Sequence, residues 1–206
     1  MGRFVELGHV VERNPQVLEA RDHLATCLHA PFYRFENGDD LSRLPLTAVA
    51  GIPGLVVDAS PQPGALELEL DKETIKDRAV IIRTGWDERW GTAGYWEPGP
   101  HIQAEILDLL VGGGAALVGV DFWNIDDAAD LASKARTRLL RAGVLVVEHL
   151  CNLRGLPREG FRFFAVPLRI AGGASFPVRA FAELAFETAA RGVPATVRAR
   201  RERHAP

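Results

Sequence analysis

The chain has 206 residues, 47% of them hydrophobic and 25% charged, with a formal net charge of −3. This composition is ordinary for a globular protein with a sizeable core, which argues against a disordered chain. The basic residues are spread along the sequence, so we expect no nucleic-acid partner, since binding to nucleic acid needs a concentrated basic face. Only the tail from about residue 195 is locally basic, and we interpret it as a solvated terminus.

The start of the chain, "MGRFVELGHV", does not resemble a secretion signal. No stretch approaches the roughly 20 apolar residues that cross a bilayer, so we expect no membrane partner and a cytoplasmic protein. In that compartment Cys27 and Cys151 are expected to be reduced. A length of 206 residues is most simply a single domain, 1–206.

Strands dominate the first half of the predicted structure. A short apolar run occupies residues 2–11, and residues 12–21 read as a loop. A helical patch is expected to end near Gly51. The β-branched run over residues 53–60 predicts a strand, and the alternation of apolar and polar residues over 64–70 predicts a half-exposed one.

Strands and helices alternate in the second half. The predicted strands cover residues 78–86, 115–122, 144–150 and 161–170, and the predicted helices cover 99–114 and 127–143. Residues 175–192 are expected to lead into a last helix. Strands alternating with helices are typical of crossovers onto one sheet. The fold class predicted from the pattern is therefore α/β, a layered domain with a strand-rich N-terminal half.

The segment "DHLATCLHAPFY" holds two histidines and a cysteine at positions that an extended strand would turn to one side. Cys27 and His29 are two residues apart, and His23 lies four residues before Cys27. Three side chains that can bind a metal would then point into one pocket. The alternative is a buried strand with a packed thiol and hydrogen-bonded imidazoles, and the residues alone leave both open.

Four large aromatic residues, Trp86, Trp90, Tyr95 and Trp96, gather in one segment that has neither helical nor strand periodicity. We therefore expect them outside the core, either as the wall of a pocket for a flat aromatic substrate or in contacts between subunits. Phe122 stands at the carboxyl end of a predicted strand, where α/β sheets often contact ligands.

Several phrases of the chain occur together in one known family. They are "RTGW", the pattern E-x-L-x-N-L in "EHLCNL", and "PLRI" followed at fixed spacing by "PVRA". On these the chain resembles the cyclase-like metal-dependent hydrolases, a family that includes bacterial kynurenine formamidase and isatin hydrolase. The resemblance implies a swivelling β/β/α layered fold and a homodimer or homotetramer.

The signature of that family, H-x-G-T-H-x-D-x-P-x-H, corresponds to residues 23–33. The resemblance implies that the three metal ligands are His23, Cys27 and His29, where Cys27 replaces a histidine and His29 an aspartate. This softer set favours zinc over manganese, because the hard carboxylate oxygen is gone.

The catalytic positions of the family have changed more. Two histidines that the family uses for proton transfer correspond to Tyr33 and Arg136, and its active-site glutamate corresponds to Glu148. Arginine is effectively always protonated and cannot serve as a base. We expect Glu148 to move protons, Tyr33 to orient or protonate the substrate, and Arg136 to hold an anionic group. The alternative for Glu148 is a simple ion pair with Arg136.

The sequence thus predicts a zinc-dependent hydrolase or cyclase acting on an amide, lactam or lactone-type carbonyl of a small aromatic molecule. Its expected substrate contacts are Trp86, Trp90, Trp96 and Phe122. The alternative is a metal-free or inactive family member that binds a small molecule or a partner protein.

Overall fold

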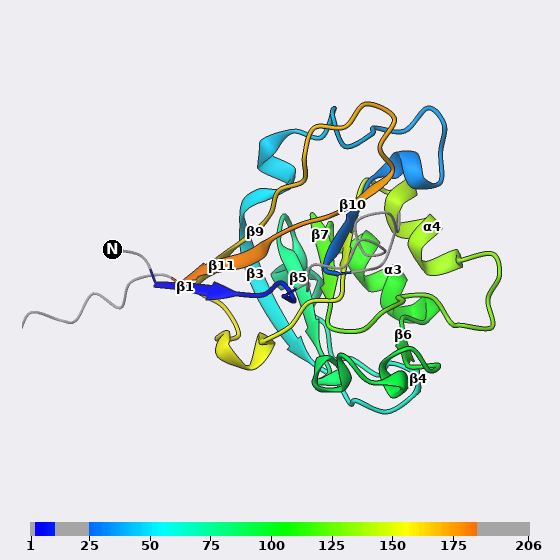
Figure 1. Cartoon of the computed structure of the whole chain (residues 1–206), viewed down its shortest axis with the longest axis vertical. Helices are drawn as coiled ribbons and strands as arrows, with labels where there is room; N and C mark the ends of the chain where they lie inside the picture. Colours follow the sequence, from blue (N-terminus) through cyan, green and yellow to red (C-terminus); the bar gives the residue numbers. More distant parts are fainter. Residues whose placement is uncertain (1–2, 11–24, 185–206) are drawn as a thin grey trace, which may run out of the picture.

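A mixed sheet of nine strands runs through residues 3–10 and 25–184, the part of the chain that this computed structural model describes (Figure 1). Across the sheet the order is β1-β11-β9-β3-β5-β7-β8-β2-β10. The strands are β1 (Arg3–Glu6), β2 (Cys27–His29), β3 (Ala50–Asp58), β5 (Ala79–Arg83), β7 (Leu117–Val120), β8 (Leu145–Glu148), β9 (Phe161–Ala165), β10 (Ser175–Pro177) and β11 (Ala180–Leu184). A second, two-stranded sheet consists of β4 (Gly64–Ala65) and β6 (Pro100–His101).

The described helices are few and short. They are α2 (Lys72–Ile75), α3 (Ala104–Gly112) and α4 (Lys134–Arg141). Single turns of 3₁₀ helix occur at Pro31–Tyr33, Leu46–Ala48, Trp86–Arg89, Ala93–Tyr95 and Leu153–Gly155. None of the helices in the described ranges is long and apolar enough to cross a membrane.

The centre of the sheet is parallel, because β3, β5, β7 and β8 pair in the same direction. These strands are short apolar runs rich in β-branched residues, which is typical of strands covered on both faces. Along the chain α3 connects β5 to β7 and α4 connects β7 to β8, and Figure 1 shows both helices on one side of these strands.

Alternation along each central strand produces a core on either face of the sheet. On the face of α3 and α4, Val80, Val118 and Val146 pack with Leu110 and Leu139 of the helices. The residues between them, such as Ile81 and Val147, belong to a second core.

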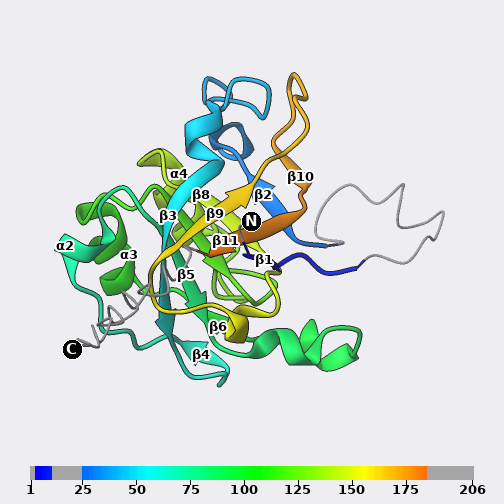
Figure 2. The ribbon, with the colours of Figure 1, turned by 90° about the vertical axis from the view of Figure 1, so that its left-hand side faces the viewer.

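That second core is closed by the antiparallel end of the sheet. Phe161 and Phe163 of β9 and Ala180 and Ala182 of β11 pack in it, and Leu7 joins them. Figure 2 shows β9 and β11 crossing over the central strands, so the sheet curls into a half-barrel.

Most predicted elements of the second half are present in shorter form. The strands β5, β7, β8 and β9 and the helices α3 and α4 all lie within their predicted ranges. The glycine run after α3 ends the helix, with Gly114 in the left-handed region at φ 72°. In the first half β3 matches the predicted strand, and the helical patch before Gly51 is the 3₁₀ turn Leu46–Ala48.

One element prediction is wrong. Only Gly64–Ala65 of the run 64–70 is a strand, because β6 offers just two residues to pair with. The run 175–192 begins with β10 and β11, and the helix into which it is expected to lead stays a prediction. The predicted loop at 12–21 and the end of this last run, 185–192, lie outside the described residues. That 1–206 is one domain stays a prediction.

Candidate functional site

Strand β2 brings two of the predicted ligands against β8. The two strands are antiparallel, with Cys27 opposite Glu148 and His29 opposite Val146. Paired residues of neighbouring strands lie on the same face, so the thiol, the imidazole and the carboxylate all project toward the face that carries α4. Leu28 points the other way, into the second core.

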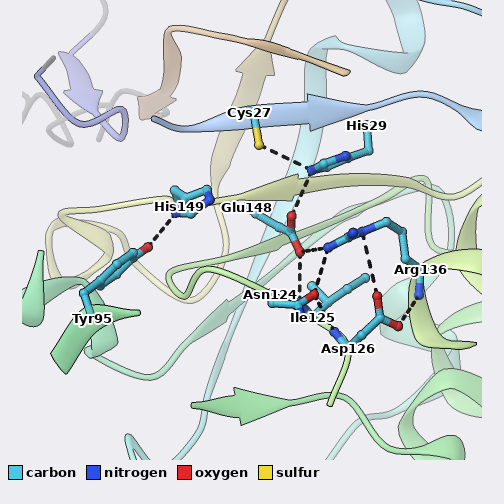
Figure 3. A network of polar contacts seen from close by, with 9 residues as sticks. All are labelled: Cys27, His29, Tyr95, Asn124, Ile125, Asp126, Arg136, Glu148 and His149. Atoms are coloured by element: carbon cyan, nitrogen blue, oxygen red, sulfur yellow. Dashed lines mark hydrogen bonds and ion pairs between the residues drawn. The ribbon is translucent and has the colours of Figure 1, made fainter. Parts of the chain in front are cut away.

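The three side chains form one buried polar cluster, which Figure 3 shows in close-up. The Sγ atom of Cys27 lies 3.3 Å from Nε2 of His29, and the same nitrogen lies 2.9 Å from Oε2 of Glu148. The three metal-binding atoms are all within 4.8 Å of one another, and none of the three residues exposes any surface. We call this group the Cys27–His29–Glu148 cluster.

Arg136 approaches the cluster from α4. Its Nη2 donates to Oε1 of Glu148 at 2.6 Å and to Oδ1 of Asn124 at 2.9 Å. Its backbone N–H donates to Oδ1 of Asp126 at 3.1 Å, and the backbone N–H of Ile125 donates to Oε1 of Glu148 at 2.9 Å. The loop between β7 and α4 therefore holds both Arg136 and Glu148 in place.

These contacts decide the charge of Glu148. Burial alone would raise its pKa, but the charge of Arg136, and after it those of His29 and His149, lower the pKa below its ordinary value. Burial likewise acts to lower the pKa of Arg136, but Glu148 and Asp126 raise it above the ordinary value. Glu148 is thus an ionised carboxylate paired with a guanidinium, and a carboxylate with a lowered pKa is a weak general base.

Tyr33 closes one side of the cluster. Its ring meets the ring of His29 edge to face, with centroids 4.9 Å apart, and the guanidinium carbon of Arg136 lies 5.4 Å from the centroid of the Tyr33 ring. Pro31 starts the 3₁₀ turn that carries Tyr33 back over the end of β2. The structure thus places three of the predicted catalytic residues, Glu148, Arg136 and Tyr33, around His29.

Part of the predicted substrate wall lies in the core. Trp86 and Phe122 expose none of their surface and pack in the core under α3 and α4. The indole N–H of Trp86 donates to the backbone oxygen of Tyr95, which is also fully buried. The expectation that this segment stands outside the core is wrong for Trp86 and Tyr95, and Trp86 and Phe122 offer no surface to a substrate.

Trp90 and Trp96 are the predicted wall residues that keep exposed surface. Trp96 is 47% exposed, while Trp90 is partly buried and stacks on His9 with ring centroids 3.8 Å apart. The two indoles lie 6.1 Å apart, and Trp96 is 5.7 Å from the ring of His149, measured between centroids. The rings of Trp90, Trp96 and His149 therefore form a contiguous aromatic group that extends from the protein surface to the residue next to Glu148.

Two polar residues of the site were not singled out from the sequence, Asn124 and His149. Asn124 contacts Arg136, and a ring nitrogen of His149 lies 2.9 Å from the hydroxyl oxygen of Tyr95. The sequence signal for His149 was its place directly after Glu148. His23, the remaining predicted ligand, lies outside the described residues.

The donor set fits a metal such as zinc. Zinc binds thiolate, imidazole and carboxylate at about 2.0–2.3 Å, so donors within 4.8 Å of one another can share one ion with small side-chain adjustments. Neither Cys27 nor Cys151 forms a disulfide among the described residues, so the thiol of Cys27 can serve as a ligand.

Comparison with known proteins places the chain in a family. Residues 5–127, more than half of the chain, match the Cyclase family model, whose description reads "Putative cyclase". The chain belongs to the cyclase family. This confirms the resemblance seen in the sequence.

Named relatives cover most of the chain. The kynurenine formamidase of Salinibacter ruber is 30% identical over 173 residues, which cover 79% of this chain and 76% of that protein. The kynurenine formamidase of Maricaulis maris is 28% identical over 160 residues, covering 77% of this chain and 75% of that protein.

Solved structures share the fold. Isatin hydrolase A from Labrenzia aggregata, bound to benzyl benzoate, superposes with a TM-score of 0.71 at 22% identity and covers 90% of this chain and 94% of its own. A structure described as a potential metal-dependent hydrolase with cyclase activity superposes with a TM-score of 0.69 at 19% identity, covering 89% of this chain and 98% of its own. The α/β layered fold predicted for the cyclase family is therefore confirmed.

Proposed function

We propose that this protein is a metal-dependent hydrolase that acts on an amide, lactam or lactone-type carbonyl of a small aromatic molecule. The observation that carries the proposal is the buried Cys27–His29–Glu148 cluster, found in a member of the cyclase family. The names of the relatives, kynurenine formamidase and isatin hydrolase, support hydrolysis of an amide-type bond in an aromatic compound.

Zinc is the metal we assign. Cys27 and His29 would hold it together with Glu148, and His23, outside the described residues, is a further ligand candidate. The thiolate favours zinc over manganese, which prefers oxygen ligands. Bound there, zinc would supply a Lewis acid that polarises a carbonyl group.

The residues around the cluster have distinct tasks in this proposal. Arg136 keeps Glu148 ionised, and Asn124 and Asp126 keep Arg136 turned toward it. The carboxylates of Glu148 and Asp126 already surround the guanidinium of Arg136. We therefore propose that Arg136 holds Glu148 in position and does not bind an anionic group of the substrate. Tyr33, whose ring lies against His29 and Arg136, orients the substrate through its hydroxyl.

The substrate side of the site is aromatic. Trp90 and Trp96 would contact a flat ring, since offset or edge contacts between aromatic rings are favourable. Hydrolysis and ring closure pass through the same addition to a carbonyl, so a cyclase reaction would use the same residues in the reverse direction. We propose a homodimer or homotetramer for the assembly.

Metal content tests the proposal most directly. Protein purified without chelator should contain about one zinc ion per chain, as a site with three protein ligands predicts. Cys27→Ala and His29→Ala should lose it, while Cys151→Ala, the matched control at the other buried cysteine, should retain it. A protein that binds no divalent metal even when zinc is supplied would be a metal-free family member that binds a small molecule or partner.

Activity is measured on aryl amides, lactams and lactones, with isatin and N-formylkynurenine included. We expect turnover within this panel but weak or no hydrolysis of N-formylkynurenine, because Tyr33 and Arg136 stand where the family has proton-transferring histidines. Rapid hydrolysis of N-formylkynurenine would show that these two replacements leave the family reaction intact. A protein that turns over no member of the panel would contradict the proposed function.

A further inference from the structure

The Cys27–His29–Glu148 cluster is closed to solvent. None of its three side chains exposes any surface, and His149, which follows Glu148, is also fully buried. A molecule from solution can therefore meet the cluster only when a side chain that covers it moves aside. Many enzymes enclose their site in this way, with a loop that opens for the substrate and then shuts out water. The cover that is held least firmly should be the one that opens.

The cover on the side of Tyr33 is firmly held. The backbone N–H of Phe32 donates to the oxygen of Asp39 at 3.0 Å, which ties the 3₁₀ turn to the loop after it. A Cβ atom on Gly38 would lie 2.8 Å from the carbonyl carbon of Pro31, so that loop packs directly on the turn. Moving Tyr33 away from the cluster would disturb all of these contacts together.

Residues 85–99 form the second cover, which we call the aromatic loop, and its inner part is anchored. The indole N–H of Trp86 donates to the backbone oxygen of Tyr95 at 3.1 Å, and both residues are fully buried. Trp90 stacks on His9, with ring centroids 3.8 Å apart. These contacts fix three of the four large aromatic side chains of the loop.

Trp96, the fourth, lies exposed at the outer part of the aromatic loop. Its ring centroid is 5.7 Å from that of His149 and 6.5 Å from that of Trp123, which is partly buried in the loop after β7. The indole N–H of Trp123 donates to the backbone oxygen of Glu97 at 2.9 Å. Water can replace this hydrogen bond at the surface, so the bond holds the segment only weakly.

We propose that Trp96 and Trp123 form the gate of the site. The hydrogen bond from Trp123 to Glu97 holds Trp96 over His149, beside the cluster, and a substrate enters where the two indoles separate. Trp123 is then a specificity-determining residue, because the space that it leaves limits the size of the molecule that can pass. Entry of a substrate rests on the proposed function, whereas the opening is a property of the chain that is measured without turnover.

The thiol of Cys27 can report the opening, because a reagent in solution reaches it only when the cluster is uncovered. The full chain with Cys151→Ala has Cys27 as its only cysteine, and chelator keeps metal off the thiol. The rate of labelling by 5,5′-dithiobis(2-nitrobenzoate) is measured in native buffer. Trp123→Phe keeps a ring and removes the N–H donor, so labelling should accelerate about 5-fold. Trp123→Ala also removes the ring and should accelerate labelling about 20-fold or more.

Controls separate this gate from the other cover and from unfolding. Phe35→Leu removes a ring beyond the Tyr33 turn, where it contacts Arg141, and should leave the labelling rate unchanged. Low concentrations of urea should hardly change the rate, because a local opening exposes little surface. Thermal unfolding should show that the Trp123 variants stay folded at the assay temperature.

Substrate preference tests the role of Trp123 in the zinc-loaded protein. Of two aryl substrates from the panel that differ in size, Trp123→Ala should favour the bulkier one in kcat/KM by at least about 5-fold relative to the wild type. A merely structural role would lower kcat/KM for both substrates alike.

The outcomes are distinct. Labelling that stays unchanged in both Trp123 variants would overturn the gate, as would a rate that rises with urea in step with global unfolding. An unchanged preference in an active Trp123→Ala would overturn the entry of substrate at this point. If the Trp123 variants accelerate labelling but the wild type turns over no member of the panel, the gate stands and the proposed function fails.

Discussion

Nη2 of Arg136 lies 2.6 Å from Oε1 of Glu148, and the two side chains are only 6% and 0% exposed. A pair buried this deeply loses the hydration of both ions, so each partner depends on the other. Arg136→Met should lower the free energy of unfolding by about 3–5 kcal/mol, because it leaves an ionised carboxylate buried without its cation. The double variant Glu148→Gln/Arg136→Met should be more stable than Arg136→Met alone.

Chemical denaturation in the presence of chelator measures this effect without a contribution from metal binding. The control is Arg138→Met on the same helix, which breaks the exposed ion pair with Asp108 and should cost less than about 1 kcal/mol. Equal costs for Arg136→Met and Arg138→Met would show that the buried pair contributes no more than a surface one.

The Arg136–Glu148 pair also shows how far the sequence could predict the site. The spacing of Cys27 and His29 was enough to place them on one side of a strand, because alternation is a local property of extended backbone. That Glu148 stands opposite Cys27 depends on β2 inserting between β8 and β10, a pairing of segments more than 100 residues apart. No local pattern specifies that register.

The errors have similar causes. Trp86 and Tyr95 were expected outside the core because their segment has no periodicity, but burial of an irregular loop is decided by tertiary packing around Trp86. His149 was not predicted because, in a regular strand, its side chain would point to the face opposite that of Glu148. The positive φ of His149 ends this alternation, and the apolar sequence before it does not predict such a backbone angle.

Gly54 should be intolerant of any side chain. A Cβ atom at this position of β3 would lie 2.0 Å from a ring carbon of Phe161 on the neighbouring β9. Gly54→Ala should therefore destabilise the protein by about 1–3 kcal/mol, since two well-packed strands must separate or the ring must leave its place. Gly54→Ala/Phe161→Leu should recover part of the loss. Gly94→Ala is the matched control, because its Cβ would meet nothing closer than 3.7 Å. Thermal unfolding of the three variants and the wild type measures these differences.

Tyr33 should matter through its hydroxyl for catalysis and through its ring for stability. Tyr33→Phe keeps the edge contact with His29 and the place of Arg136 over the ring, so the free energy of unfolding should change by less than about 0.5 kcal/mol. If the hydroxyl orients the substrate, kcat should fall about 10-fold or more. Phe35→Leu removes a comparable contact with Arg141 on α4 and should leave kcat unchanged. A fully active Tyr33→Phe would leave Tyr33 with a packing role only.

His9 should make the protein sensitive to mild acid. Burial lowers the pKa of His9 to about 4, against an ordinary value near 6.5, because its ring stacks on Trp90. The pKa of His9 is lower in the folded protein than in the unfolded chain. As the pH falls, His9 is therefore protonated below about pH 6.5 in the unfolded chain but only near pH 4 in the folded protein. Stability contributed by the neutral ring is therefore present above pH 6.5 and is lost as the pH falls toward 4. His9→Phe keeps an aromatic ring for the stack and cannot titrate, so its melting temperature should decline less over this window than that of the wild type. Parallel melting curves for the two proteins would contradict the assignment of this acid sensitivity to His9.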